Sequence, residues 1–234
     1  MVREELIERS PLRILENSTH GGIGPGDIGV IASPKGVGKT ACLVHIATDQ
    51  LFQGKHVIHV SFAGRTDHII SWYEDIFAEI ARRRKLDSAM EVHDQIIKNR
   101  VIMNFNQEGI SAEQFLSSIR AMIDDGGFEA DTIIIDGYDF TKGTPENIGK
   151  TCDFAKDMGL AIWFSASLPP GQTDADERGI PVILTGYEPH LSVVVTLSST
   201  QDHVMLYLVK DRDRFERENL HLRLDPKSLL IASE

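Results

Sequence analysis

The sequence predicts an α/β fold whose central sheet is mostly parallel and is extended at one edge by antiparallel strands. Over the first two-thirds of the 234 residues, apolar β-branched runs alternate with amphipathic stretches of helical period, which is typical of strands joined by helical crossovers. The C-terminal part instead holds strand-like runs separated by gaps too short for a helix, so hairpins replace the crossovers there. A chain of this length can bury one substantial core.

The alternating part of the chain contains the expected parallel strands and their helices. The strands are expected at 27–33, 56–62, 101–105, 132–136 and 161–166. The helices, with apolar residues three and four positions apart, are expected at 39–52, 66–84, 111–124 and 145–158. The third of these begins with Ser111 and has Gln114 three residues later, a capping-box pattern. The C-terminal strand-like runs lie at 193–197, 204–209, 220–224 and 229–231.

Two stretches interrupt this scheme. The cationic run Arg82–Lys85 opens a polar segment that continues to Arg100. Cations at a helix end complement the helix dipole, and a partner-binding patch is the other interpretation. A loop expected at 169–191 contains glycine, proline and the acidic run Asp174–Glu177. Because it is long for a connection within a domain, we expect a functional or mobile loop.

Residues 33–40 fit the pattern of a phosphate-binding P-loop, with Ser33 where the first glycine is usual. In such a loop a strand ends and backbone N–H groups converge on phosphate oxygens at a helix N-terminus. Lys39 is expected to reach the β- and γ-phosphates, and the Thr40 hydroxyl to bind magnesium. The expected nucleotide-binding set is Ser33, Pro34, Lys35, Gly36, Val37, Gly38, Lys39, Thr40 and Ala41. The alternative is a glycine-rich turn with this spacing by chance, which the strand before it and the helix after it disfavour.

A second magnesium contact is expected from Asp136, at the end of the apolar run 132–136. A carboxylate at the tip of a buried strand can hold a magnesium-bound water near Thr40. The alternative is an aspartate that only starts the turn 136–139. With the P-loop upstream, the sequence predicts ATP and Mg²⁺ as the cofactors.

The order of these motifs resembles that of the RecA-like ATPases, in particular the branch of KaiC and the DnaB helicases. The segment Gly21–Asp27 is similar to that family's glycine-rich lead-in to the first strand, and Lys210-Asp211-Arg212 matches its Lys-x-Arg motif on an antiparallel C-terminal strand. The resemblance covers nearly the whole chain. It implies a RecA-like three-layer P-loop NTPase fold, with one ATP-binding domain over 1–234 and an N-terminal lead-in at 1–20.

The resemblance also implies functional roles. It assigns catalytic positions to Lys39, Asp136, Lys210 and Arg212. The last two match residues that, in ring-forming members, reach the γ-phosphate of the neighbouring subunit. This implies a homo-oligomer, with a hexameric ring as one form. The alternative for this pair is a solvated strand end.

One departure from the family pattern concerns hydrolysis. Ala63 stands where the family's second strand ends in a glutamate that orients the attacking water. The position after Asp136, where other P-loop ATPases carry a glutamate, is Gly137. Asp67 and Asp139 are substitutes that nothing in the sequence positions. Because a water-orienting or basic group contributes roughly 10²–10⁴ in rate, we expect slow or absent ATP hydrolysis.

Charge argues against nucleic acid as a partner. Lys and Arg number 24 and Asp and Glu 35, so the formal net charge is −11, which repels phosphate backbones. The acidic run at 174–177 also falls in the loop that, in recombinases of the superfamily, helps to hold DNA.

Composition gives an expectation for location. The two isolated cysteines fit a reducing cytoplasm. The charged N-terminus lacks the apolar centre of a signal peptide, and no uncharged apolar stretch approaches the roughly 20 residues that span a bilayer. A cytoplasmic protein without a membrane partner is therefore expected.

Several functional classes remain open. The first is an ATP-binding regulator or assembly factor of the KaiC-like type. The second is a catalytically silent, nucleotide-gated module that recruits a protein partner, and the third is an active DNA-dependent ATPase of recombinase or helicase type. A ParA/MinD-type protein is disfavoured because its signature lysine would fall at Pro34. A small-molecule kinase is disfavoured because no Arg-rich lid motif is evident.

Overall fold

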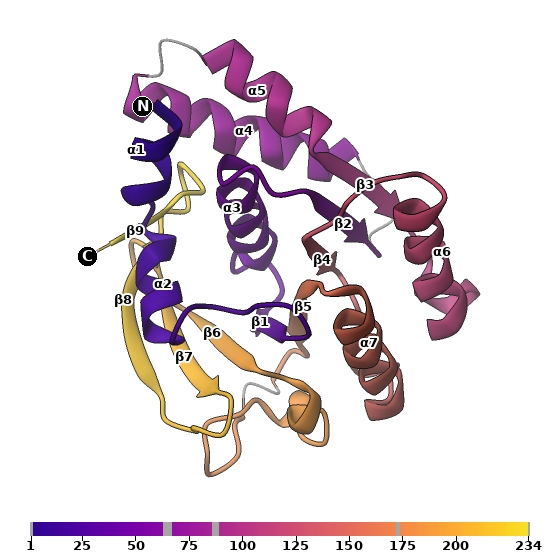
Figure 1. Cartoon of the computed structure of the whole chain (residues 1–234). Helices are drawn as coiled ribbons and strands as arrows, with labels where there is room; N and C mark the ends of the chain where they lie inside the picture. Colours follow the sequence, from indigo (N-terminus) through magenta and orange to yellow (C-terminus); the bar gives the residue numbers. More distant parts are fainter. Residues whose placement is uncertain (1, 63–66, 86–88, 172–173, 234) are drawn as a thin grey trace.

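The centre of the molecule is a mixed sheet with helices on both faces (Figure 1). The computed structural model describes residues 2–62, 67–85, 89–171 and 174–233. In this described part the strand order is β3-β2-β4-β5-β1-β6-β7-β8-β9. The strands from β3 to β6 are parallel to their neighbours, and the pairs from β6–β7 to β8–β9 are antiparallel. The predicted α/β fold, with its antiparallel C-terminal extension, is confirmed.

Most strands lie within two residues of their predicted bounds. They are β1 (Ile28–Pro34), β2 (Val57–Ser61), β3 (Arg100–Asn104), β4 (Thr132–Asp136), β5 (Ala161–Leu168), β6 (Val193–Ser199), β7 (Val204–Asp211), β8 (Glu218–Leu224) and β9 (Ile231–Ser233). The last strand was expected to start at Leu229. It starts at Ile231 instead because Leu229 has a φ of +60° in a turn, where its N–H donates to the carbonyl of Asp225 at 2.8 Å.

The helices include three that the sequence did not predict. They are α1 (Val2–Glu8), α2 (Leu12–Ser18), α3 (Lys39–Phe52), α4 (Asp67–Arg84), α5 (Ala89–Lys98), α6 (Ala112–Asp124) and α7 (Pro145–Met158), with 3₁₀ turns η1 (Gln107–Gly109), η2 (Val182–Leu184) and η3 (Glu188–His190). The first two lie in the expected lead-in, and α5 lies in the polar segment after Arg84. Its only buried side chain is Ile96, so its hydrophobic periodicity is weak. The capping box of α6 is confirmed, since Ser111 and Gln114 each accept from the other's backbone N–H.

Two apolar cores lie on opposite faces of the sheet. Ile31 and Trp163 belong to the core under α3 and α4, whereas Val30 and Ile162 belong to the core under α6 and α7. Successive residues of a strand point to opposite faces, so β1 and β5 contribute to both cores. The result is a three-layer arrangement, with α1, α3, α4 and α5 on one side and α6 and α7 on the other (Figure 1).

The described part of the 169–191 loop packs against the rest of the molecule. Ile180 is fully buried. Arg178 pairs with Asp176 at 2.9 Å and with Glu188 at 2.7 Å. One residue of the acidic run therefore has a cationic partner within the loop.

The described helices include none that is both long enough and apolar enough to span a bilayer. Cys42 and Cys152 are buried free thiols.

Candidate phosphate-binding site

The predicted P-loop connects the end of β1 to the start of α3. Gly36 and Gly38 have φ values of +85° and +121°, which L side chains rarely adopt. A Cβ atom on Gly38 would also collide with Cδ2 of Leu224 in β8. Glycine at position 38 therefore serves both the loop conformation and the close approach of the C-terminal strands.

Lys39 lies inside this loop. Its side chain is buried, and its ammonium group donates to the carbonyls of Ser33 at 3.0 Å and Pro34 at 2.9 Å. Burial lowers the pKa of Lys39 to about 8, and the charge of Asp136 opposes that shift. The ammonium is therefore held at the end of β1 by acceptors that a phosphate oxygen can replace.

The side chains expected to bind magnesium are in direct contact. The Thr40 hydroxyl, on α3, donates to Oδ2 of Asp136, at the end of β4, at 2.8 Å. Hydroxyl and carboxylate oxygens are ligands that suit Mg²⁺, which uses one or two protein oxygens together with substrate phosphates. The described residues include no group of three or more His, Cys, Asp or Glu that could hold a metal, and a nucleotide-bound Mg²⁺ does not need one.

Ser165 on β5 positions Asp136, and sequence reasoning missed it. Its hydroxyl donates to Oδ1 of Asp136 at 2.6 Å and accepts from the N–H of Gly137 at 2.8 Å. Both carboxylate oxygens of Asp136 are thus engaged, one by Ser165 and one by Thr40. The available signal was a hydroxyl residue within an apolar, buried strand.

The positions considered for a catalytic carboxylate differ in what the structure shows. Ala63 lies outside the described residues. Gly137 has a φ of +81°, so a glutamate there would strain the backbone. Oδ1 of Asp139 accepts from the N–H of Thr141 at 2.9 Å and from its hydroxyl at 2.6 Å, which is a local turn contact. Asp67 lies in the first turn of α4.

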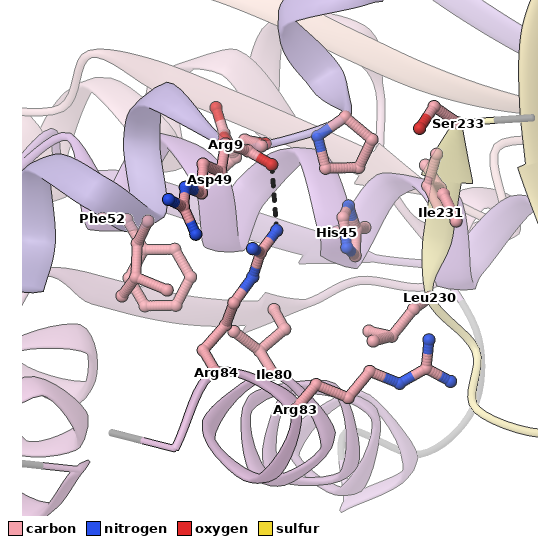
Figure 2. Close-up of a pocket in the computed structure, with 14 residues that line it drawn as sticks. Arg9, His45, Asp49, Phe52, Ile80, Arg83, Arg84, Leu230, Ile231 and Ser233 are labelled. Atoms are coloured by element: carbon pink, nitrogen blue, oxygen red, sulfur yellow. Dashed lines mark hydrogen bonds between the residues drawn. The ribbon is translucent and has the colours of Figure 1, made fainter. Parts of the chain in front are cut away.

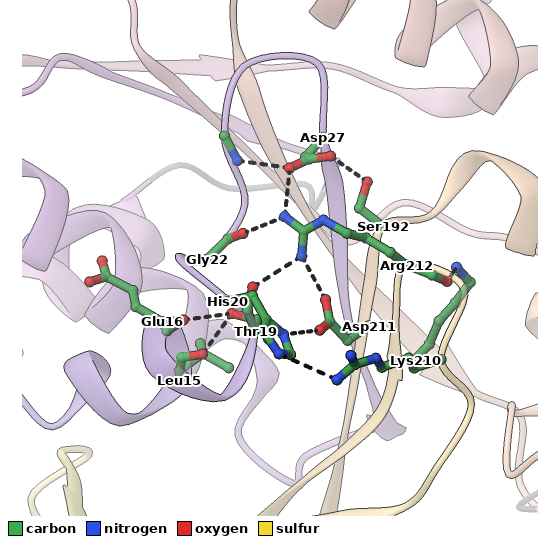
Figure 3. Close-up of polar contacts among 12 residues, drawn as sticks. Leu15, Glu16, Thr19, His20, Gly22, Asp27, Ser192, Lys210, Asp211 and Arg212 are labelled. Carbon is green, nitrogen blue, oxygen red and sulfur yellow. Dashed lines mark hydrogen bonds and ion pairs between the residues drawn. The ribbon is translucent and has the colours of Figure 1, made fainter.

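Arg212 ties β7 to the glycine-rich lead-in (Figure 3). Its guanidinium donates to the carbonyls of Thr19 and Gly22, each at 3.0 Å. It also pairs with Asp211 at 2.6 Å and with Asp27 at 3.4 Å. The two segments that carry the family resemblance, 21–27 and 210–212, are therefore bound to each other.

Lys210 is also engaged within its own chain. Its ammonium donates to the carbonyl of Arg212 and lies 5.1 Å from the ring centre of Phe215. Burial is the main cause that lowers the pKa of Lys210. The role of this pair across a subunit boundary stays a prediction.

A groove of about 460 Å³ lies beside the P-loop. Pro34 and Val37 form its loop side, and residues of β5, β6 and the 169–191 loop form the rest. Arg217 contributes a charged group to the lining and stacks over the Tyr207 ring, 4.0 Å from its centre. The groove thus offers mostly apolar walls next to the phosphate-binding loop.

Comparison with known proteins supports the fold. No protein-family model matches the chain, and the comparison with curated proteins finds no match either. Among solved structures, the chain is similar to the ATPase domain of a DnaB-like helicase, with a TM-score of 0.69 and 15% identity over 96% of this chain and 90% of that one. This likeness confirms the RecA-like fold that the resemblance implied.

Proposed function

We propose that the protein binds ATP with Mg²⁺ through residues 33–41 and Asp136. We further propose that it acts as a nucleotide-dependent regulator or assembly factor that hydrolyses ATP slowly or not at all. The observation that carries the proposal is the contact between Thr40 and Asp136, directly beside the Lys39 ammonium at the N-terminus of α3. An Mg²⁺-bound triphosphate requires this combination of a cation, a hydroxyl, a carboxylate and a helix N-terminus.

Each residue has a distinct task in this proposal. The Lys39 ammonium exchanges its carbonyl acceptors for β- and γ-phosphate oxygens. Thr40 and Asp136 hold the metal, and Ser165 keeps the Asp136 carboxylate oriented. Bound Mg²⁺ neutralises charge on the phosphate oxygens. The apolar groove beside Pro34 is the proposed place for the nucleoside.

Slow hydrolysis is supported by the surroundings of Asp136. The strained conformation that a non-glycine residue would have at Gly137 disfavours a carboxylate there. Asp139 is occupied by its own turn. The same observations favour the second candidate, a catalytically silent module that recruits a protein when nucleotide binds, and a phosphate-release assay separates the two.

Assembly is the part of the proposal with the simplest readout. Since the family resemblance implies that subunits share the nucleotide, we expect ATP·Mg²⁺ to shift the chain from 26.0 kDa monomers to a homo-oligomer, with a hexamer as one form. Light scattering with and without ATP·Mg²⁺ measures this shift. Lys39→Ala should remove it. Monomers under both conditions, at concentrations where ATP is bound, would contradict the assembly role.

The third candidate, a DNA-dependent ATPase, is tested by DNA binding. The cationic run at the end of α4 is partly neutralised, because Glu79 pairs with Arg82 at 2.6 Å and with Arg83 at 2.7 Å. Affinity for DNA grows with the number of phosphates neutralised, so we expect no tight binding to single- or double-stranded DNA at about 150 mM salt. Fluorescence anisotropy measures this. A low-nanomolar dissociation constant, lost when Arg82–Lys85 are changed to glutamine, would favour the helicase or recombinase class.

A further inference from the structure

A second cavity, of about 310 Å³, lies against the later turns of α3 (Figure 2). Its walls come from the α1–α2 junction, from α3, from the end of α4 and from the segment that includes β9. This volume is within the range of small-molecule sites. Its lining shares no residue with the P-loop or with the groove beside it, so it is separate from the proposed nucleotide site.

Polar atoms without a partner are concentrated beside this cavity. His45 and Asp49 line it, are 5% and 3% exposed, and leave Nδ1 and Oδ1, respectively, without a hydrogen bond. In the described residues, four of the six buried side-chain atoms of this kind belong to His45, Asp49, Thr48 and Arg13. The first three share one face of α3, and Arg13 binds the other oxygen of Asp49. Since buried polar atoms are normally satisfied, such a concentration points to a ligand.

The rim of the cavity is cationic. Arg9, Arg83 and Arg84 contribute to the lining. The Arg84 guanidinium extends toward the α1–α2 junction, where it donates to the Arg9 carbonyl at 3.0 Å (Figure 2). Arg83 pairs with Glu79 at 2.7 Å and lies 3.6 Å from Asp225. Guanidinium groups favour carboxylates and phosphates, so the rim selects an anionic group.

The interior adds two further requirements. Phe52, Ile80 and Leu230 supply apolar surface, which suits a hydrocarbon or aromatic body. Burial lowers the pKa of His45 to about 4, so its imidazole is neutral near pH 7. The free oxygen of Asp49 is an acceptor and calls for a hydroxyl or amine donor. The lining therefore describes one amphipathic molecule rather than a simple anion.

We propose that this cavity binds a small organic acid. Its carboxylate or phosphate group lies against Arg83 and Arg84, its apolar body packs on Phe52 and Ile80, and a donor group binds Asp49. The inference stands independently of nucleotide binding, because it depends on a different set of side chains.

Titration of ¹⁵N-labelled protein, without nucleotide, tests the proposal. The probes are 4-hydroxyphenylacetate, which has a carboxylate, a ring and a donor, and phenyl phosphate, which replaces the carboxylate with phosphate. The neutral 4-hydroxyphenylacetamide is the control. We expect at least one acid to bind saturably with a dissociation constant below about 1 mM, with shifts at cavity residues such as Ile80 and Leu230. The amide should bind about tenfold more weakly.

A matched pair of variants identifies the site. Arg84→Gln should weaken binding of the acid about tenfold, which corresponds to about 1.4 kcal/mol. Arg82→Gln changes the same residue type on the same helix, but Arg82 is not part of the lining, and it should leave the affinity unchanged. Both residues are exposed at a helix end, so folding is not at risk. No saturable shift with either acid, or equal losses in the two variants, would overturn the proposal.

Discussion

Replacing Lys39 with alanine is expected to weaken ATP binding by about a hundredfold, as measured by titration calorimetry. The change removes a charged donor from a buried position at the end of β1. A hydrogen bond to a charged group contributes about 1.5–3 kcal/mol, and each 1.4 kcal/mol is about a factor of ten in affinity. Lys35→Ala is the matched control, because Lys35 is an exposed lysine of the same loop and its loss should have a smaller effect.

The pH dependence distinguishes a phosphate contact from a structural role for Lys39. Burial holds the pKa of Lys39 at about 8 in the free protein, and pairing with phosphate would raise it. ATP binding above pH 8 then requires proton uptake, so the dissociation constant should rise by up to about tenfold per pH unit. The Lys39→Ala variant should lack this rise. If the wild type binds no ATP at any magnesium concentration, the proposed site is wrong.

Turnover by the wild-type protein is expected to be well below the typical enzyme value of about 10 s⁻¹, and Ala63→Glu is expected to raise it. A water-orienting carboxylate contributes roughly 10²–10⁴ in rate, so the gain should reach about a hundredfold if position 63 faces the γ-phosphate. Steady-state phosphate release at saturating ATP measures both rates. Ala63→Gln is the control, since it has the same shape without the charge.

Position 137 gives a second control for this experiment. Gly137→Glu also adds a carboxylate, but at a φ of +81°, so no comparable gain is expected. Rapid hydrolysis by the wild-type protein that disappears in Lys39→Ala would contradict slow turnover. It would direct attention to Asp67 or Asp139 as the base.

The sequence predicted those features that depend on local pattern. The strand–loop–helix order around 33–40 and the apolar run 132–136 each form a continuous signal, and the structure places Thr40 and Asp136 in contact as expected. Helix α5 was missed because Ile96 is its only buried side chain. Ser165 was missed because its role depends on a neighbouring strand.

The second cavity could not be predicted for a similar reason. Within α3, His45 and Asp49 look like ordinary helix residues. Their lack of partners becomes visible only when the α1–α2 junction, the end of α4 and the C-terminal segment meet around them. The contacts of Arg212 with residues 19–27 are likewise determined by tertiary structure.

The position of β1 in the sheet has a consequence for biosynthesis. This strand leads into the P-loop and is made early, yet its neighbours are β5, through pairs such as Ile28 with Ile162, and β6, through pairs such as Gly29 with Val193. Pairing between residues so distant in sequence slows folding. On the ribosome, the phosphate site therefore cannot assemble until residues beyond Val193 have emerged. Until then the apolar edges of β1 are exposed, and the nascent chain is a substrate for chaperones.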